Sequence, residues 1–271
     1  MTSAVPRFIS MRLRSVLTLC WFSMLTACAG HQQSVVDPAG PQSGKIATLW
    51  WFFFYLLGAI FLTVMVLLIG TLMRRQPRTE TAAQQENHSV PEETESKLTR
   101  VVTGATIVTV LILFVLLIAS IGTGKATADL GRKPNLLKIE VTGNQWWWQF
   151  RYLSDDPSQT LTTANEIHIP VGRTVLIQGM SNDVIHSFWV PNLHGKRDLI
   201  PSRVTTEYIQ ADKPGVYRGQ CAEFCGLQHA HMSFYVIAEP EDKFEAWMQA
   251  QLQPTPTPAN ATLKQGQQSF L

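Results

Sequence analysis

Two long apolar stretches in the first half of the chain restrict the folds that it can adopt. Residues 46–73 and 101–121 consist almost entirely of Leu, Ile, Val, Phe and other uncharged side chains. At about 1.5 Å per helical residue, each stretch is long enough to cross roughly 30 Å of hydrocarbon. The sequence therefore predicts a helical hairpin over residues 46–122 that crosses a membrane twice, with a connecting loop at residues 74–100.

The basic residues around the hairpin predict its orientation. Those in the connecting loop are Arg74, Arg75, Arg78, Lys97 and Arg100. The segment before the first helix holds only Lys45. Because short cytoplasmic loops collect Lys and Arg, we expect the loop to be cytoplasmic and both ends of the hairpin to lie on the outer side.

The first 27 residues resemble an export signal. Three arginines precede an apolar run at residues 16–25, which is too short to span a bilayer. The run ends at Leu25-Thr-Ala-Cys28, which resembles a bacterial lipoprotein signal, so we expect residues 1–27 to be removed and Cys28 to receive lipid. A signal cut elsewhere is the alternative. Residues 28–45 are polar with Gly and Pro, which is typical of a flexible periplasmic tether.

After the hairpin, the sequence changes to short runs of strand-forming residues divided by Gly, Pro and Asn. These runs cover residues 137–141, 146–152, 166–170, 174–179, 185–190, 204–209, 215–219 and 231–238. Many short strands at this spacing predict an all-β sandwich or barrel, here over residues 135–252. Apolar residues at helical spacing after residue 241 predict a short helix at the end of this domain.

Charge and cysteine content exclude two classes of protein. Lys and Arg number 22 against 20 Asp and Glu, for a formal net charge of +2. This balance gives no electrostatic reason to expect a nucleic-acid partner. The chain holds 4 cysteines, too few for a disulfide framework.

One short stretch is rich in metal-binding side chains. It reads Cys221-Ala-Glu-Phe-Cys225-Gly-Leu-Gln-His229-Ala-His231-Met232. Thiolate and thioether donors favour copper(I), zinc or iron–sulfur iron, and imidazole also suits copper, so the mixture favours copper and leaves zinc open. A local disulfide between Cys221 and Cys225 is the alternative. His186, in a strand-forming run upstream, is a further candidate ligand.

The run Gln145-Trp-Trp-Trp-Gln-Phe-Arg-Tyr152 is the second unusual feature. If it forms a strand, Trp146 and Trp148 share one face and Trp147 lies on the other. An aromatic strand can belong to the core, or it can supply exposed rings at a docking surface or along an electron route. Both interpretations stay open at this point.

These motifs together resemble subunit II of bacterial haem-copper cytochrome c oxidases. The motifs are the Trp run at 146–148, His186-Ser-Phe-Trp-Val-Pro, Gly195-Lys-Arg-Asp198 and the stretch from Cys221 to Met232. The resemblance implies a cupredoxin-like Greek-key barrel on the periplasmic side of the bacterial inner membrane. It also implies a proton-pumping oxidase that takes electrons from cytochrome c and passes them to haem in subunit I, where oxygen is reduced to water. The implied partners are subunit I, other oxidase subunits, cytochrome c and membrane lipid.

The metal site of this family is CuA, a pair of copper ions bridged by two cysteine thiolates. By resemblance, Cys221 and Cys225 are the bridges, and His186 and His229 each bind one copper. Met232 is a weak further ligand.

The resemblance also implies roles for two neighbouring residues. The backbone carbonyl of Glu223 completes the ligand set, and its side chain reaches a magnesium ion shared with subunit I. Trp146 matches the point at which electrons enter from cytochrome c. His231 falls outside the family's pattern.

Three other functions stay open from the sequence. A CuA-bearing nitric oxide reductase subunit would share the ligands, whereas a quinol oxidase subunit II shares the hairpin and barrel but normally lacks them. A copper-storage or assembly lipoprotein would need neither the Trp run nor Glu223. Residues 253–271 resemble a Pro-rich linker and the opening of a cytochrome c domain that some family members append, with a disordered tail as the alternative.

Overall fold

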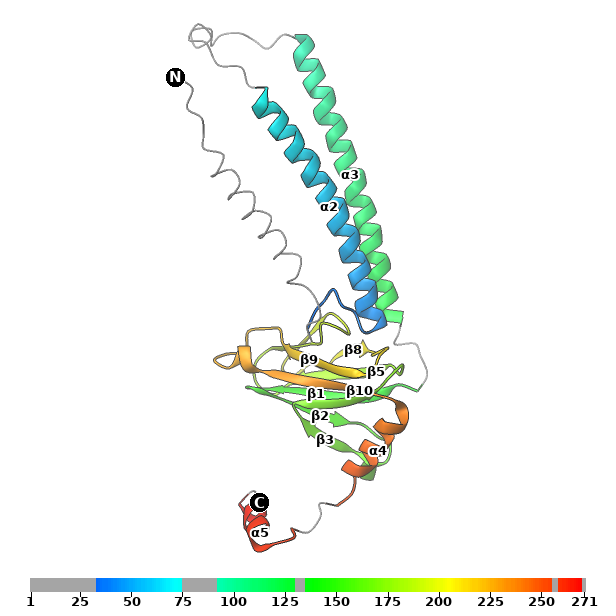
Figure 1. Ribbon diagram of the computed structural model, residues 1–271, viewed down its shortest axis with the longest axis vertical. Coiled ribbons are helices and arrows are strands. Elements are labelled where there is room, and N and C mark those ends of the chain that lie inside the picture. The colour runs from blue at the N-terminus through cyan, green and yellow to red at the C-terminus, as the bar shows by residue number, and fades with distance from the viewer. Residues whose placement is uncertain (1–32, 75–91, 130–134, 255–257, 270–271) are drawn as a thin grey trace, which may run out of the picture. The chain divides into compact units, whose positions relative to one another are not determined.

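In the computed structural model of the protein, the described residues are 33–74, 92–129, 135–254 and 258–269. The chain divides into two compact units, one of residues 41–132 and one that combines residues 1–40 with 133–271 (Figure 1). The expected export signal at residues 1–27 and the lipidation site Cys28 lie outside the described residues.

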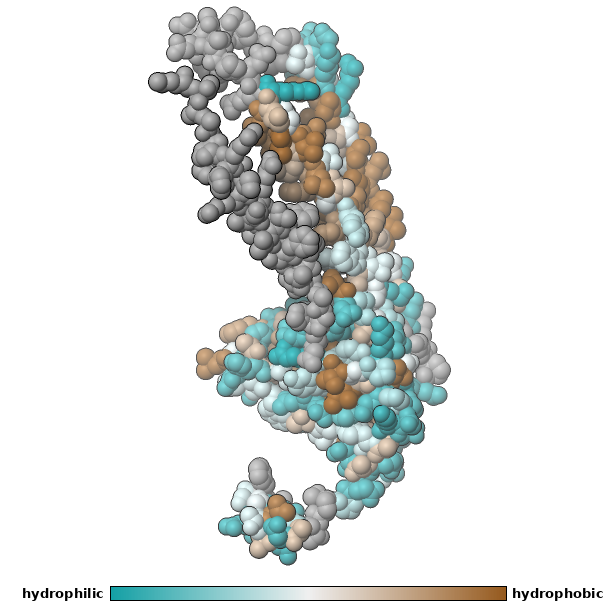
Figure 2. All heavy atoms as spheres, in the orientation of Figure 1, coloured by the Kyte–Doolittle hydropathy of each residue, from teal (hydrophilic) through white to brown (hydrophobic). Residues whose placement is uncertain are grey.

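The first unit is a pair of long helices. Helix α2 spans Pro41–Met73 and α3 spans Glu92–Ala128. Both are long and apolar enough to cross a membrane. They lie side by side, and apolar residues gather along both of them (Figures 1 and 2). Thr63 and Thr106 donate their hydroxyls to carbonyls four residues earlier, at 2.8 and 2.9 Å, so these polar groups are satisfied within their own helices.

Helix α3 begins earlier than the sequence predicted. Residues 92–100 were expected in the connecting loop, but they form its first turns. Glu92, Glu93 and Glu95 lie in the first turn, where negative charge is favourable beside the helix N-terminus. Lys97 pairs with Glu93 one turn away at 2.7 Å. The loop prediction is therefore wrong for residues 92–100, and residues 75–91 of the predicted loop lie outside the described residues.

The segment just before α2 is hydrogen-bonded to the β domain. The backbone N–H of Ala39 donates to the carbonyl of Asn192 at 2.8 Å, and the N–H of Asp212 donates to the carbonyl of Ala39 at 2.7 Å. The tether predicted over residues 28–45 is therefore wrong from residue 33 onward. Polarity alone did not reveal that this backbone has partners in the folded domain.

The second unit is a sandwich of two five-stranded sheets. In spatial order the first sheet contains β3 (Leu161–Ala164), β2 (Trp147–Tyr152), β1 (Leu137–Asn144), β5 (Val175–Ser181) and β8 (Thr205–Ile209). The second contains β4 (Glu166–Pro170), β10 (Ser233–Glu239), β9 (Gly215–Cys221), β6 (His186–Trp189) and β7 (Lys196–Leu199). The short helices are η3 (Pro157–Gln159), η4 (His229–His231), α4 (Glu241–Gln251) and α5 (Ala261–Gln268). The predicted fold class, a two-helix hairpin followed by an all-β cupredoxin-like domain, is confirmed.

The Trp run divides between core and surface. In β2, Trp148, Phe150 and Tyr152 are buried between the sheets, while Trp147 faces outward and is 40% exposed. Trp146 lies in the turn before β2 and not on the strand. The prediction that Trp146 and Trp148 share a strand face is therefore wrong, because the strand begins one residue later than expected.

Aromatic rings fill the core next to the edge that carries the cysteines. Phe234 stacks on Phe188 with ring centroids 4.8 Å apart, and it meets Trp148 at 5.2 Å and Phe150 at 5.4 Å. A Cβ atom at Gly219 would lie 2.1 Å from the Phe234 ring. Glycine at this position therefore allows the ring to lie across β9.

The sequence did not predict β3 and β7. Both are four residues long and lie at sheet edges. In β7, the three residues Lys196, Arg197 and Asp198 are exposed, so this strand lacks apolar alternation. An edge strand pairs on one side only and can tolerate such polarity. The predicted terminal helix is present as α4, whose Trp247 stacks on His168 at 3.9 Å.

Candidate metal centre

The metal-binding residues singled out in the sequence meet where β6, β9 and the loop after β9 come together. His186 is the first residue of β6, and Cys221 is the last residue of β9. We call residues 221–232 the metal loop. Its two ends are joined by the Cys221 N–H, which donates to the carbonyl of Met232 at 2.9 Å. The loop therefore starts at the end of β9 and ends directly before β10, which limits the freedom of its ligands.

The donor atoms form one compact cluster. The Sγ atoms of Cys221 and Cys225 are 3.9 Å apart, and Nδ1 of His186 lies 3.8 Å from the Cys221 sulfur. Nδ1 of His229 lies 3.6 Å and Sδ of Met232 lies 3.7 Å from the Cys225 sulfur. A disulfide would need sulfurs about 2.05 Å apart, and both thiols are free, so the structure does not form the alternative disulfide.

Burial of this cluster favours a bound cation. His186 is 0% exposed, Cys225 is 3% and Cys221 is 4%. Burial alone would raise the pKa of Cys221, but hydrogen bonds from His186 and nearby backbone groups hold it well below its usual value. Burial and then the charge of Cys221 raise the pKa of Cys225. Two buried thiolates this close would repel each other, so the donor set fits a soft metal cation such as copper.

The imidazole of His186 is held from several sides. Its Nε2 lies 2.7 Å from Oδ1 of Asp183, which leaves Nδ1 to face the sulfur of Cys221. The Trp148 ring meets it at 6.1 Å. A Cβ atom at Gly143 would lie 2.7 Å from Cδ2 of His186, so only glycine leaves room for the ring. The sequence prediction included neither Gly143 nor Asp183. The place of Asp183, three positions before the candidate ligand His186, was the one signal that could have indicated it.

Two backbone carbonyls border the cluster. The Glu223 carbonyl oxygen lies 3.2 Å from the Cys221 sulfur. The Cys225 carbonyl accepts one hydrogen bond from the Trp146 indole at 3.2 Å and another from Nε2 of Gln145 at 2.7 Å. The turn between β1 and β2 therefore contacts the metal loop directly.

The two histidines of η4 differ in their surroundings. His229 is partly buried, and its ring faces the Cys225 sulfur and the edge of Phe224 at 5.7 Å. His231 is exposed to solvent. The structure thus brings His229 into the cluster and leaves His231 outside it.

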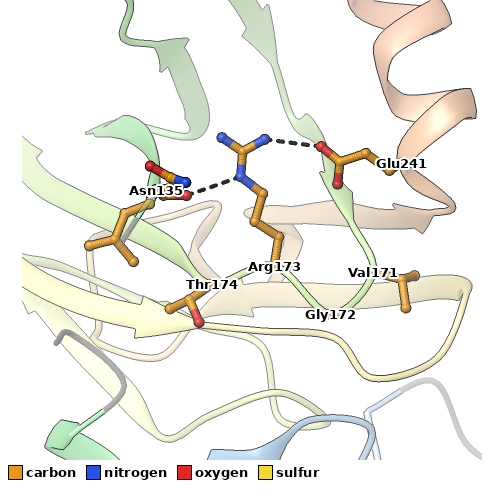
Figure 3. A pocket seen from close by; sticks show the side chains of 7 residues that line it. Asn135, Val171, Gly172, Arg173, Thr174 and Glu241 are labelled. Atoms are coloured by element: carbon orange, nitrogen blue, oxygen red, sulfur yellow. Dashed lines mark hydrogen bonds and ion pairs between the residues drawn. The ribbon is translucent and has the colours of Figure 1, made fainter. Parts of the chain in front are cut away.

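A separate surface depression lies elsewhere on the β domain (Figure 3). It measures roughly 800 Å³, and no residue of the sulfur cluster lines it. Arg173 crosses it, with Nη1 3.1 Å from Oε1 of Glu241 and Nε donating to the carbonyl of Asn135 at 3.2 Å. These two contacts join the connection between β4 and β5 to α4 and to the start of the domain, and the depression holds none of the sulfur or imidazole donors.

Comparisons with known proteins match the β domain and, for two relatives, most of the chain. A family model described as the periplasmic domain of cytochrome c oxidase subunit II matches residues 137–239. Cytochrome c oxidase subunit 2 of Alkalihalophilus pseudofirmus is 32% identical over 263 residues, with 94% of this chain and 72% of the relative covered. Quinol oxidase subunit 2 of Bacillus anthracis is 29% identical over 248 residues, with 90% and 81% covered. A solved periplasmic domain of cytochrome oxidase subunit II from Bradyrhizobium japonicum is 29% identical, covers 42% of this chain and 92% of that chain, and has a TM-score of 0.40.

Proposed function

Because the chain belongs to the cytochrome c oxidase subunit II family, we propose that it is the electron-entry subunit of a proton-pumping cytochrome c oxidase. It accepts electrons from cytochrome c at a dinuclear copper centre, CuA, and passes them to haem in subunit I, where oxygen is reduced to water. One observation carries this proposal. Two free thiols lie 3.9 Å apart, and each has its own imidazole nitrogen within 3.8 Å.

The proposed ligands are supported by this paired arrangement. They are His186, Cys221, Glu223 through its backbone carbonyl, Cys225, His229 and Met232. When bound, the two copper ions supply a one-electron redox couple. The chain holds the thiols and imidazoles on a rigid scaffold and excludes water from the buried donors, which limits rearrangement between oxidation states.

Trp146 is the proposed point of electron entry. It lies partly exposed in the β1–β2 turn, and its indole N–H donates to the carbonyl of Cys225. A hydrogen-bonded route therefore leads from a surface ring to a metal ligand. Phe224 is 77% and Leu227 is 95% exposed on the same metal loop. These side chains offer cytochrome c an apolar contact beside the metal ligands.

The remaining proposals concern the surroundings of the subunit. Helices α2 and α3 anchor it in the bacterial inner membrane, with the β domain on the periplasmic side and the basic connecting loop in the cytoplasm. The Glu223 side chain takes part in a magnesium site shared with subunit I. Cys28 carries lipid, and α5 belongs to the start of a cytochrome c domain.

A quinol oxidase is the second candidate function, because the similarity to the Bacillus anthracis subunit covers 90% of this chain. The complete set of sulfur and imidazole donors favours cytochrome c as the electron source. The purified oxidase complex separates the two functions: we expect oxygen uptake with reduced cytochrome c and none with a quinol. Uptake driven by quinol alone would favour the second candidate.

The copper content of the full chain tests the proposed site. Purified in detergent and loaded with copper, the chain should bind two copper ions and turn purple. Cys221→Ser or Cys225→Ser should abolish the two-metal spectrum. His231→Ala serves as the matched control and should keep it, because His231 lies outside the cluster. A colourless, zinc-filled or single-copper protein would contradict the assignment.

A further inference from the structure

The sulfur and imidazole donors come from two separate pieces of the fold. His186 begins β6, and 35 positions separate it from Cys221 in the sequence. Cys225 and His229 belong to the metal loop. The two pieces meet only in the folded domain, so their spacing depends on contacts between them. A shift of one piece against the other would change the distance from Nδ1 of His186 to the Cys221 sulfur, which is 3.8 Å.

One turn contacts both pieces at once. The backbone N–H of Gln145, in the turn between β1 and β2, donates to Oδ2 of Asp183 at 2.6 Å. The other carboxylate oxygen of Asp183 lies 2.7 Å from Nε2 of His186. On the opposite side, Nε2 of Gln145 donates to the Cys225 carbonyl at 2.7 Å. Three hydrogen bonds therefore connect a ligand on β6 with a ligand on the metal loop.

The parts of this connection are themselves fixed. Asp183 accepts a further hydrogen bond from the Val184 N–H at 2.7 Å, which holds its carboxylate in place. The Cys225 carbonyl also accepts from the indole of Trp146. Gly226 has a φ of 117°, and a Cβ atom there would lie 3.1 Å from Nε2 of Gln145. Glycine thus allows both the conformation of the metal loop and the close approach of the turn.

We propose that Gln145 and Asp183 are positioning residues that brace the two halves of the copper site. Neither residue supplies a ligand atom; Asp183 acts through His186, and Gln145 acts through Cys225. The brace rests on the proposed copper function and deepens it, because it fixes the separation of ligands that bind different parts of the metal pair. The brace also connects Trp146 to the ligands, because Trp146 lies in the same turn and its indole donates to the Cys225 carbonyl.

If Asp183 and Gln145 brace the copper site, their loss has effects that loss of a contact with a partner protein would not have. Asp183 is 31% exposed at its side chain, so its charge can also act on an approaching partner. A charge of that kind would change partner binding and its salt dependence. It would leave the spectrum of the copper-loaded chain unchanged when no partner is present. The test therefore uses the full chain alone, in detergent.

The experiment compares Gln145→Ala, Asp183→Ala and the double variant with the controls Gln159→Ala and Asp155→Ala. Both control residues are exposed on the connection between β2 and β3. Copper retention is measured by competition with a copper chelator, together with the visible and electron paramagnetic resonance spectra. Each brace variant should weaken retention by about tenfold or more, the usual effect of removing a group that supports a metal ligand. The double variant should lose less than the product of the single losses, because either change already breaks the brace.

Further measurements separate positioning from general damage. Asp183→Asn keeps an oxygen for His186 and should recover part of the lost retention. Circular dichroism should show folded β domain in every variant. In the copper-free chain, the NMR signal of the His186 Nε2–H should be protected from exchange, and it should be lost in Asp183→Ala and shifted in Gln145→Ala.

Two results would overturn the brace. In the first, the brace variants retain copper as well as the controls do and give the same spectra. In the second, the fold-loss of copper retention in the double variant equals the product of the losses in the two single variants. A wild-type chain that takes up no copper pair would refute the proposed function instead. In that case the His186 signal in the copper-free variants decides the brace by itself: an unchanged signal refutes it.

Discussion

The carboxyl group of Glu207 is buried in the β sandwich without a full set of partners. The residue faces inward from β8 and is 3% exposed. Its Oε1 lies 3.4 Å from Nδ1 of His194, and its Oε2 accepts no hydrogen bond from the described residues. Burial raises the pKa of Glu207 from 4.5 to about 8, although the charge of Arg197 opposes the change. Burial, assisted by Arg197, lowers the pKa of His194 from 6.5 to about 4.

These pKa values give the contribution of each of the two groups to the pH dependence of stability a definite sign. Between pH 4.5 and 8, folded Glu207 keeps a proton that the unfolded chain has lost, so stability falls as pH rises. Between pH 4 and 6.5 the unfolded chain protonates His194 and the folded one does not, so stability rises with pH. The two effects oppose each other up to pH 6.5. From there to pH 8 the Glu207 contribution alone should lower the free energy of unfolding by about 1.5 kcal/mol, while the lowered pKa of Cys221 acts in the opposite direction.

The perturbation that tests this reasoning is Glu207→Gln. Urea unfolding of the full chain in detergent, followed by tryptophan fluorescence, gives the free energy at pH 6.5 and at pH 8. The free energy of unfolding of the variant minus that of wild type should rise by about 1.5 kcal/mol from pH 6.5 to pH 8, because Cys221 titrates in both chains and its effect cancels. Glu245→Gln, at an exposed position on α4, should keep the wild-type slope. The reasoning is refuted if the difference between the variant and wild type is the same at both pH values. It is also refuted if the Gln variant is less stable than wild type at both, which would indicate an ionised Glu207 paired with a His194 cation.

Two glycine substitutions test the packing that positions the site. Gly143→Ala should displace the His186 ring and lower copper retention while the domain stays folded, because the new Cβ would lie 2.7 Å from Cδ2; an unchanged visible spectrum of the copper-loaded chain would contradict this. Gly219→Ala should lower the free energy of unfolding by about 2 kcal/mol, since the added Cβ would meet the Phe234 ring. When Phe234→Leu is combined with Gly219→Ala, part of the lost free energy of unfolding should be recovered in urea unfolding. If the double variant instead loses the sum of the two single losses, the two side chains do not compete for the same volume.

The donor set could be predicted from the sequence because it is concentrated. Two thiols, two imidazoles and a thioether within one short stretch have few structural explanations other than a metal. The hairpin was equally visible, because the length of an apolar run directly reflects the thickness of a membrane. The sequence also showed that Trp148 and its neighbours in the run could belong to a core.

The groups around the donors could not be predicted, because they come from other strands. Gly143 and Gln145 lie on or beside β1, and they approach the ligands only through pairing between distant segments. The surroundings of Glu207 depend on the same kind of contact. Alternation along β8 indicates that the residue faces inward, but it does not indicate which groups lie opposite its carboxyl. Polarity was also a poor guide to order at residues 33–40, where backbone groups bond to the loops that follow β6 and β8.

The segment of residues 33–40 makes the β domain discontinuous in sequence. Gln33 donates to Gln220 at 3.0 Å across a separation of 187 residues, and the whole helical pair is inserted between the two parts of the domain. During synthesis residues 33–40 are made long before their partners, which lie at residues 192–220. Because α2 and α3 also precede every strand, both apolar helices are complete before the β domain can close.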